Sequence, residues 1–254
     1  MSKLMALENI TWQPSPNFDE RGADTPIDML VLHYTGMRTA KEALDRLTDA
    51  EAKVSAHYFV DEDGGITSLV PEEQRAWHAG VSEWRGESNI NARSIGIEVV
   101  NPGHEFGYRP FPERQMAAVK ALSVDIVKRH QIPAWNVVGH SDVAPDRKED
   151  PGELFDWRGL SDAGVGLWFQ ASAAIPHSDI DISTGAQGAE VFELQQALRE
   201  IGYGATPTGL FDPAFENIIR AFQRHWRAVR VDGIADPETQ GIVYAVLAEV
   251  RRLT

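Results

Sequence analysis

IDMLVLHYTG, residues 27–36, is a short apolar run that ends in a histidine, a tyrosine and a glycine. Its length and its apolar, partly β-branched composition predict a buried β-strand that stops at Gly36. The next segment, RTAKEALDRLTDA (38–50), carries Thr39 and Glu42 at the spacing of a capping box, followed by apolar residues at helical spacing. We therefore predict a strand, a turn and a helix at this point.

Further segments extend the pattern. VSAHYFVDEDGGITSLV (54–70) places two β-rich runs around Asp-Gly-Gly and predicts a hairpin. RSIGIEVVN (93–101) alternates as a strand does, so Glu98 points away from its apolar face. PERQMAAVKALSVDIVKRHQ (112–131) predicts an amphipathic helix, and AWNVVGH (134–140) predicts one more strand. The first part is thus an α/β domain with a mixed central sheet flanked by helices.

The remainder of the chain is predicted to be helical. Small and polar residues without a sustained period precede it, as is typical of a linker. A weak internal repeat with an offset of 24 residues contains an Asp-Pro pair in each copy. Asp212-Pro213 and Asp236-Pro237 are predicted to be the N-caps and first residues of two helices. We expect a small all-α three-helix domain. The predicted division is a first domain over 1–171, a linker over 172–186 and the helical domain over 187–254.

Composition excludes several classes of protein. With 254 residues, 43% of them hydrophobic, the chain can bury a core, and its net charge of −14 argues against a nucleic-acid binder. The absence of cysteine excludes disulfides and Cys-type zinc sites. No segment approaches the length of a transmembrane helix, and the first residues lack the apolar stretch of a signal peptide. We expect a cytoplasmic protein, with the periplasm or cell envelope as the alternative.

Two histidines and one aspartate are candidate metal ligands. His33 ends the first predicted strand, and His140 ends a later one, ten residues before Asp150. A catalytic zinc site usually has three nitrogen or oxygen ligands from the protein and leaves the fourth position to water. Strand ends are rigid platforms on which such ligands can meet. By spacing alone, however, each of the eight histidines is more often an ordinary packed or solvated side chain.

The order of five motifs favours the interpretation as metal ligands. The chain resembles type 2 N-acetylmuramoyl-L-alanine amidases, zinc enzymes that cut stem peptides from the muramic acid of peptidoglycan, over roughly residues 25–170. The motifs are LVLHYTG, SAHYFV, RAWHAG, SIGIEVVN and VVGHSDVAPDRKEDPG. The tail, from AEVFELQQALREIGYG to VDGIADPETQGIV, resembles the three-helix peptidoglycan-binding domain attached to many cell-wall hydrolases.

The resemblance implies a role for each matching residue. It makes His33, His140 and Asp150 the ligands of one zinc ion, Glu98 the general base and Lys148 the stabiliser of the transition state. The implied reaction is hydrolysis of the amide between N-acetylmuramic acid, including its 1,6-anhydro form, and L-alanine. Glu98 takes a proton from water and returns it to the leaving nitrogen. The expected partners are peptidoglycan or muropeptide fragments, while the oligomeric state stays open.

Four more residues are candidate substrate contacts. Tyr34 follows a candidate ligand and is expected to wall the pocket, and Trp77, His78 and Asn89 match places where the family lines its substrate groove. Aromatic rings suit the apolar faces of sugars, and amides or imidazoles suit their hydroxyls, but structural packing explains these residues equally well. The family often has a histidine at the position of His57, which we do not expect to be a ligand. No motif surrounds the other histidines, which are His104, His130, His177 and His225.

Two other functions remain open at this point. Peptidoglycan recognition proteins share the amidase fold, and many of them have lost a ligand and only bind, whereas all three ligand positions are present here. A zinc endopeptidase that cuts within the stem peptide is the other alternative. The substrate is also open: recycling enzymes of the family act on anhydromuropeptides without a binding tail, whereas envelope enzymes with a tail accept intact wall. We expect a recycling enzyme that kept its tail.

Overall fold

The computed structural model describes residues 10–23, 25–170 and 178–254. Its main sheet has six strands in the order β1-β5-β4-β7-β3-β8. The neighbours β4, β7, β3 and β8 are parallel, and β5 runs antiparallel to β4 and parallel to β1. A second sheet pairs β2 with β6. The strands are β1 (Thr11–Trp12), β2 (Phe18–Glu20), β3 (Met29–Tyr34), β4 (Tyr58–Val60), β5 (Ile66–Ser68), β6 (Gln74–Ala76), β7 (Ser94–Val99) and β8 (Val137–Gly139).

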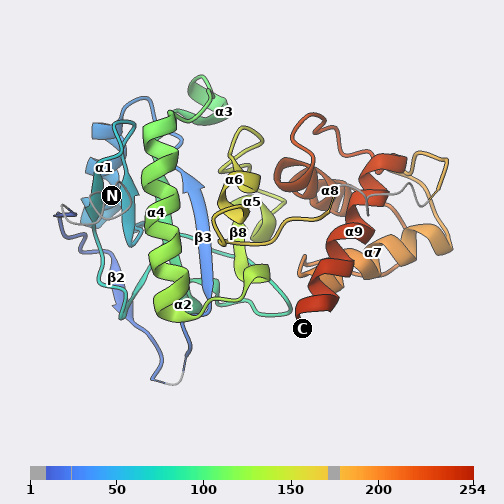
Figure 1. Ribbon diagram of the computed structural model, residues 1–254, viewed down its shortest axis with the longest axis horizontal. Helices are drawn as coiled ribbons and strands as arrows, with labels where there is room; N and C mark the ends of the chain where they lie inside the picture. Colours follow the sequence, from blue (N-terminus) through green and yellow to red (C-terminus); the bar gives the residue numbers. More distant parts are fainter. Residues whose placement is uncertain (1–9, 24, 171–177) are drawn as a thin grey trace.

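The helices lie on both faces of the main sheet and at its β8 side (Figure 1). Two short 3-10 turns, Ala50–Ala52 and Ala134–Asn136, complete the described part of the chain. The helices are α1 (Ala40–Thr48), α2 (Ile90–Arg93), α3 (Gly103–Phe106), α4 (Glu113–His130), α5 (His140–Val143), α6 (Trp157–Ser161), α7 (Ala189–Ile201), α8 (Pro213–Trp226) and α9 (Pro237–Leu253). None of these helices is both long and apolar enough to cross a membrane.

One face of the sheet is covered by α4, as its amphipathic pattern predicted (Figure 1). The apolar alternates of β7, which include Ile95 and Ile97, are fully buried in one cluster with Val119, Leu122 and Ile126 of α4. Removing that much apolar surface from water is the main stabilising contribution to this layer. The opposite face of β7 is therefore left for Gly96 and Glu98, as the alternation indicated.

The local signals of the first domain are also confirmed. The Thr39 side chain accepts a hydrogen bond of 3.1 Å from the backbone N–H of Glu42 and caps α1. The predicted hairpin forms between β4 and β5. One boundary is wrong: of the strand predicted over 134–140, only 137–139 is extended. Ala134–Asn136 forms a 3-10 turn after Pro133, and the side chain of Asn136 donates to the carbonyl of Asp28.

The predicted helical tail is three helices, α7 to α9. Asp212 and Asp236 each accept a hydrogen bond of 2.8 Å from the backbone N–H three residues on, and proline follows each as the first helical residue. Of the predicted linker, 172–177 lies outside the described residues, as does His177. The rest of it joins the tail, because Ile182 forms an isolated β-bridge with Ala235.

The tail shares a core with the sheet. Met29 and Val31 of β3 and Val138 of β8 belong to one buried apolar cluster with residues from α7, α8 and α9. These β3 residues alternate with those that face α4, so the cluster lies on the opposite face of the sheet, and it extends to the tail through residues such as Trp84 and Val143. Figure 1 shows the three helices together at the β8 side of the sheet. The strand that carries His33 is therefore packed between the cluster under α4 and the cluster that extends to the tail.

Candidate metal centre and active site

The carboxyl ends of β7, β3 and β8 meet at one edge of the sheet. β3 lies between the other two and is parallel to both, with His33 directly opposite Glu98. Side chains of directly opposite residues point to the same face. His140 follows β8 at once as the first residue of α5, and Asp150 ends the loop that comes next. The sheet thus brings together four side chains that are far apart in sequence.

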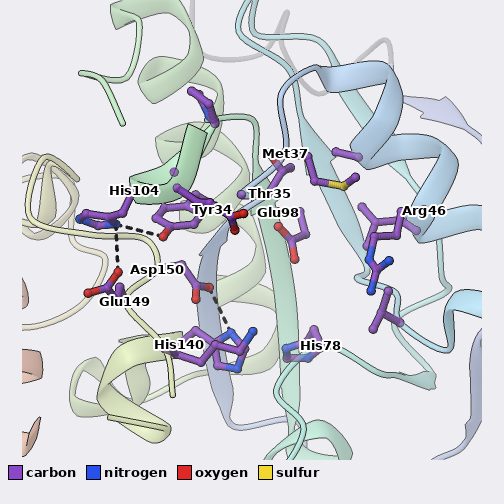
Figure 2. Close-up of a pocket in the computed structure, with 18 of the residues that line it drawn as sticks. Tyr34, Thr35, Met37, Arg46, His78, Glu98, His104, His140, Glu149 and Asp150 are labelled. Carbon is purple, nitrogen blue, oxygen red and sulfur yellow. Dashed lines mark hydrogen bonds and ion pairs between the residues drawn. The ribbon is translucent and has the colours of Figure 1, made fainter. Parts of the chain in front are cut away.

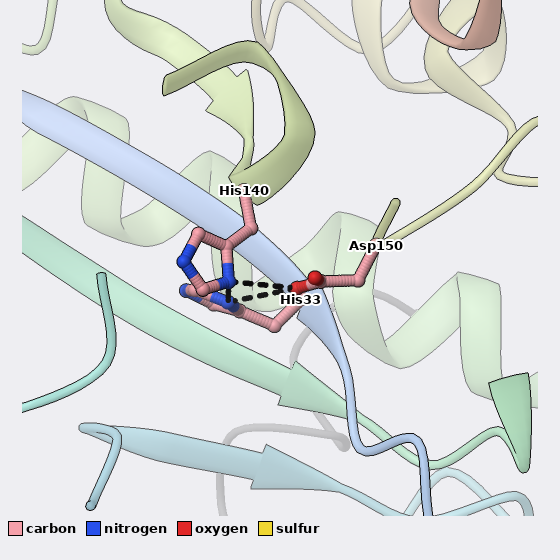
Figure 3. A group of neighbouring side chains, drawn as sticks. All are labelled: His33, His140 and Asp150. Atoms are coloured by element: carbon pink, nitrogen blue, oxygen red, sulfur yellow. Dashed lines mark hydrogen bonds and ion pairs between the residues drawn. The ribbon is translucent and has the colours of Figure 1, made fainter. Parts of the chain in front are cut away.

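Three of these side chains converge on one point (Figure 3). Nδ1 of His33 lies 3.0 Å from Nδ1 of His140, and each of these atoms lies 3.1 Å from Oδ2 of Asp150. All three residues are buried. Ligands bound at about 2.0–2.2 Å to one tetrahedral zinc ion lie roughly 3.3–3.6 Å apart. The triangle therefore needs to open by only a few tenths of an ångström to hold such an ion.

The protonation of His140 suits a ligand. Its Nε2 lies 3.0 Å from the backbone carbonyl of Ala79, which can only accept a hydrogen bond, so Nε2 carries the proton. The lone pair of Nδ1 then faces Asp150. A metal-binding histidine ordinarily donates its other N–H in this way, which fixes both the tautomer and the ring orientation.

His33 is held by a longer chain of hydrogen bonds. Its Nε2 lies 3.0 Å from Nδ1 of His78, whose Nε2 lies 3.2 Å from the hydroxyl of Ser94, and that hydroxyl donates to the carbonyl of Ile90. Because the carbonyl can only accept, the Ser94 hydroxyl donates to it and accepts from the Nε2–H of His78. Nδ1 of His78 then accepts from the Nε2–H of His33, which leaves Nδ1 of His33 without a proton. Burial, then the neighbouring His140, lowers the pKa of His33 to about 4. The neutral imidazole is the form that binds a metal.

Gly96 explains how His78 fits behind His33. A Cβ atom built on Gly96 would lie 2.5 Å from Cγ of His78, so a side chain on this position of β7 would displace the ring. The RAWHAG motif predicts that His78 lines the substrate groove. It does line the cavity described below, but its two ring nitrogens are used to orient His33.

We expect His78→Leu to weaken zinc binding by about 10–100-fold, because the buried Nε2–H of His33 loses its acceptor and the ring loses its orientation. His78→Asn is the matched variant, since the asparagine Oδ1 occupies the place of Nδ1 and can still accept. Its zinc affinity should stay near that of the wild type. The measurement is competition with a chromophoric chelator, and equal affinities for the leucine variant and the wild type would refute this role.

Glu98 is the fourth side chain at this edge. Its Oε2 is buried and has no hydrogen-bond partner among the described residues. Burial, then the charge of Asp150, raises the pKa of Glu98 well above its ordinary value, while the charge of Lys148 opposes this. Buried polar groups nearly always have partners, so an unpartnered carboxylate oxygen marks a place prepared for another molecule. A carboxyl of raised pKa suits proton transfer near neutral pH.

A cavity of about 400 Å³ opens over this group (Figure 2). Tyr34, Trp77 and Lys148 line it, as does Glu98, so the structure brings these predicted residues together. Asn89 is not among the lining residues and is exposed at the N-terminus of α2. The structure therefore does not bring Asn89 to the cavity. We omit it from the site.

His104, which carried no motif, stands at the rim of the cavity (Figure 2). Its Nε2 lies 3.1 Å from Oε2 of Glu153, its Nδ1 lies 3.0 Å from the hydroxyl of Tyr34, and its ring stacks on Tyr108 at 4.3 Å. Its place in the sequence, just after the end of β7, was the signal that could have identified it. His57 is not part of the group, because Nδ1 accepts from Gly96 and Nε2 lies 3.1 Å from the carbonyl of Gln74.

Two buried histidines and one carboxylate around a point at the edge of a sheet, with an acid–base candidate beside them, are an arrangement typical of mononuclear metal hydrolase sites. Comparison with known families identifies the kind. Residues 23–153 match the family model described as N-acetylmuramoyl-L-alanine amidase, and residues 187–242 match the model described as a putative peptidoglycan binding domain. The chain belongs to the N-acetylmuramoyl-L-alanine amidase family, as its five motifs predicted.

Known amidases are similar in sequence to large parts of this chain. The N-acetylmuramoyl-L-alanine amidase AmiD of Escherichia coli K12 is 37% identical over 240 residues, which are 87% of this chain and 82% of AmiD. The 1,6-anhydro-N-acetylmuramyl-L-alanine amidase AmpD of the same organism is 36% identical over 161 residues, which are 57% of this chain and 86% of AmpD. The match with AmiD therefore extends into the tail.

Solved structures of related proteins are also similar to this chain over most of its length. The complex of AmiD from E. coli with the substrate anhydro-N-acetylmuramic acid-L-Ala-D-gamma-Glu-L-Lys has a TM-score of 0.77 and 35% identity, and covers 91% of this chain and 97% of that one. AmpDh3 from Pseudomonas aeruginosa, in complex with an anhydromuramic pentapeptide, has a TM-score of 0.72 and 33% identity, and covers 92% and 94%. The predicted fold class is confirmed.

Proposed function

We propose that this protein is a zinc-dependent amidase that hydrolyses the bond between N-acetylmuramic acid and the L-alanine of peptidoglycan stem peptides. The observation that carries the proposal is the convergence of His33, His140 and Asp150 beside the unpartnered carboxylate of Glu98. Bound there, zinc would supply Lewis acidity, which lowers the pKa of water and stabilises charge on an amide oxygen. The donor set of two imidazoles and a carboxylate suits zinc.

The residues of the chain then have distinct roles. Glu98, on the strand beside His33, takes the proton of the attacking water as its oxygen bonds to the lactyl carbonyl carbon. Lys148, half-buried at the cavity wall, holds a positive charge where the tetrahedral oxygen becomes negative. When the carbon–nitrogen bond breaks, Glu98 returns the proton to the amine of L-alanine. Tyr34 and Trp77 offer ring faces to the sugar.

We propose the 1,6-anhydro form as a substrate, because two solved relatives carry anhydromuramyl peptides. The test is mass spectrometry of products from soluble anhydromuropeptides and from intact sacculi, each with and without a chelator. We expect free stem peptides that begin with L-alanine, and no product once the chelator is present. Peptides that begin after L-alanine would indicate an endopeptidase, and binding without products would indicate a recognition protein.

Lys148→Met is expected to lower kcat by about 10²–10³-fold, the loss typical of one donor to a tetrahedral oxyanion. Lys148 is not among the atoms of the metal group, so zinc content should be unchanged. Lys128→Met, on the exposed side of α4, is the control for loss of a positive charge. Steady-state kinetics with elemental analysis checks this, and a variant with wild-type kcat would remove Lys148 from the mechanism.

We further propose that the amidase domain (1–171) cuts the bond and that the peptidoglycan-binding domain (187–254), which follows the predicted linker (172–186), contacts the polymer. The match of residues 187–242 to a putative peptidoglycan binding domain supports this. A cytoplasmic location stays a prediction from the sequence. Recovery with periplasmic or envelope markers on cell fractionation would contradict it.

A further inference from the structure

Two consecutive residues at the end of α8 hold the loop that carries two of the three candidate ligands. We call residues 140–150 the metal loop, because it begins with His140, ends with Asp150 and includes Lys148. His225 contacts Asp142, near the start of this loop, and Arg224 contacts Glu149, next to its end. The tail thus contacts the metal loop near both of its ends.

The contact at the start of the loop is a buried network around one carboxylate. Nδ1 of His225 lies 2.7 Å from Oδ2 of Asp142, and the hydroxyl of Tyr203, between α7 and α8, donates to Oδ1 at 2.7 Å. Oδ2 also accepts from the backbone N–H of Gly139 at 2.7 Å. Asp142 is 0% exposed. A carboxylate so deeply buried requires these donors, and the two from side chains both come from the tail.

The ring of His225 is fixed from both sides. It stacks on Trp157 of α6 at 3.8 Å between ring centroids and on Trp226 at 4.2 Å, with interplanar angles of 15° and 5°. Its Nδ1 therefore has little freedom to turn away from Asp142. Because Asp142 is two residues after His140 and bonds to the residue before it, the position of this hydrogen bond defines the turn that presents His140.

The contact at the end of the loop is an ion pair. Arg224 Nη2 lies 2.6 Å from Oε1 of Glu149, and the Arg224 side chain is 10% exposed. Glu149 precedes Asp150 and follows Lys148, so its position constrains a ligand on one side and the candidate charge stabiliser on the other. Between these two ends, the guanidinium of Arg147 bonds to the carbonyl of Val81 at 3.0 Å.

We propose that the C-terminal helices are a positioning element of the metal centre, with His225 and Arg224 setting the geometry of the metal loop. The inference rests on the proposed metal site and goes beyond wall binding, which is the role implied by the similarity of the tail. It requires that a change in the tail alter the affinity for zinc and the turnover of a small soluble substrate that has no wall to tether.

Two variants of His225 separate the hydrogen bond from packing. His225→Phe keeps the stacked ring and removes the donor to Asp142, so zinc affinity should fall by about tenfold, at the low end of what loss of a residue that orients a ligand costs. Tm should fall as well, because the buried carboxylate loses a donor. His225→Asn keeps a donor at the place of Nδ1 and removes the ring. It should lower Tm and leave zinc affinity near the wild-type value.

The control is Asp212→Ala, at the opposite end of the same helix, which removes an N-cap without touching the metal loop. It should lower Tm and leave zinc affinity unchanged. Arg224→Met tests the second contact with the same readouts. Zinc dissociation constants come from chelator competition, Tm from thermal unfolding, and kcat from a soluble anhydromuropeptide and from intact wall, all with the full chain.

The proposal expects His225→Phe to weaken zinc binding and to slow hydrolysis of both substrates by the same factor. Unchanged zinc affinity with a loss confined to intact wall would overturn it, because the tail would then act only as a tether. Affinities that follow Tm across all variants would also overturn it, because the effect would be general destabilisation. A wild-type protein that binds no zinc would instead refute the proposed function.

Discussion

Glu98→Gln is expected to slow hydrolysis by about 10²–10⁴-fold, the range that a positioned general base contributes. Glutamine has the same shape but cannot take a proton from water. The buried Oε2 of Glu98 has no partner to lose among the residues that the structure describes, and Glu98 is not one of the three clustered ligands. The fold and the zinc content should therefore be preserved while turnover collapses.

The measurement combines kcat with elemental analysis and Tm for the purified variant. Glu113→Gln, an exposed carboxylate in the first turn of α4 that does not line the cavity, removes the same charge and should leave turnover near the wild-type value. If Glu98→Gln retained the wild-type kcat with one zinc ion bound, Glu98 would not be the base. Loss of zinc in this variant would instead place Glu98 among the ligands.

Asp150→Ala has the second large effect, which is on metal binding itself. Structural zinc ions bind small protein domains with about 10–16 kcal/mol, so a quarter of that, the share of one ligand among four, is roughly 2.5–4 kcal/mol. This corresponds to a loss of about 10²–10³-fold in affinity. Hydrolysis should fall with zinc occupancy and return in part when excess zinc is added.

Asp146→Ala is the matched control, because Asp146 lies in the same loop, is exposed and is not part of the cluster. It should keep the wild-type zinc affinity. Both variants are dialysed against a chelator of known affinity and assayed for zinc and for turnover. An Asp150→Ala protein that held one zinc ion as tightly as the wild type would exclude Asp150 as a ligand.

Local patterns predicted the layers of the fold well. The apolar run of β3, the alternation of β7 and the helical period of α4 depend on neighbours a few residues away, and the structure bears out all three. The alternation of β7 also fixed the side of the sheet to which Glu98 points. The strand predicted over 134–140 was too long, because the turn after Pro133 is stabilised by Asn136 bonding to a distant backbone carbonyl.

The functional site was harder to predict, because strand order decides which strand ends become neighbours. Spacing alone did not separate His33 and His140 from the other histidines, and the resemblance of whole motifs was needed. His104 and His225 carried no motif, and their contacts with Tyr34 and Asp142 exist only in three dimensions. His78 was predicted as a substrate contact, and its hydrogen bonds to His33 and Ser94 depend on the same packing.

The central claim is that three side chains hold one zinc ion at the edge of the sheet. Anomalous diffraction at the zinc absorption edge, from crystals of the wild-type protein grown with zinc, tests it most directly. We predict one strong peak about 2.0–2.2 Å from Nδ1 of His33, Nδ1 of His140 and Oδ2 of Asp150. A structure with these three side chains ordered but no peak between them, or with zinc held by other residues, would contradict the claim.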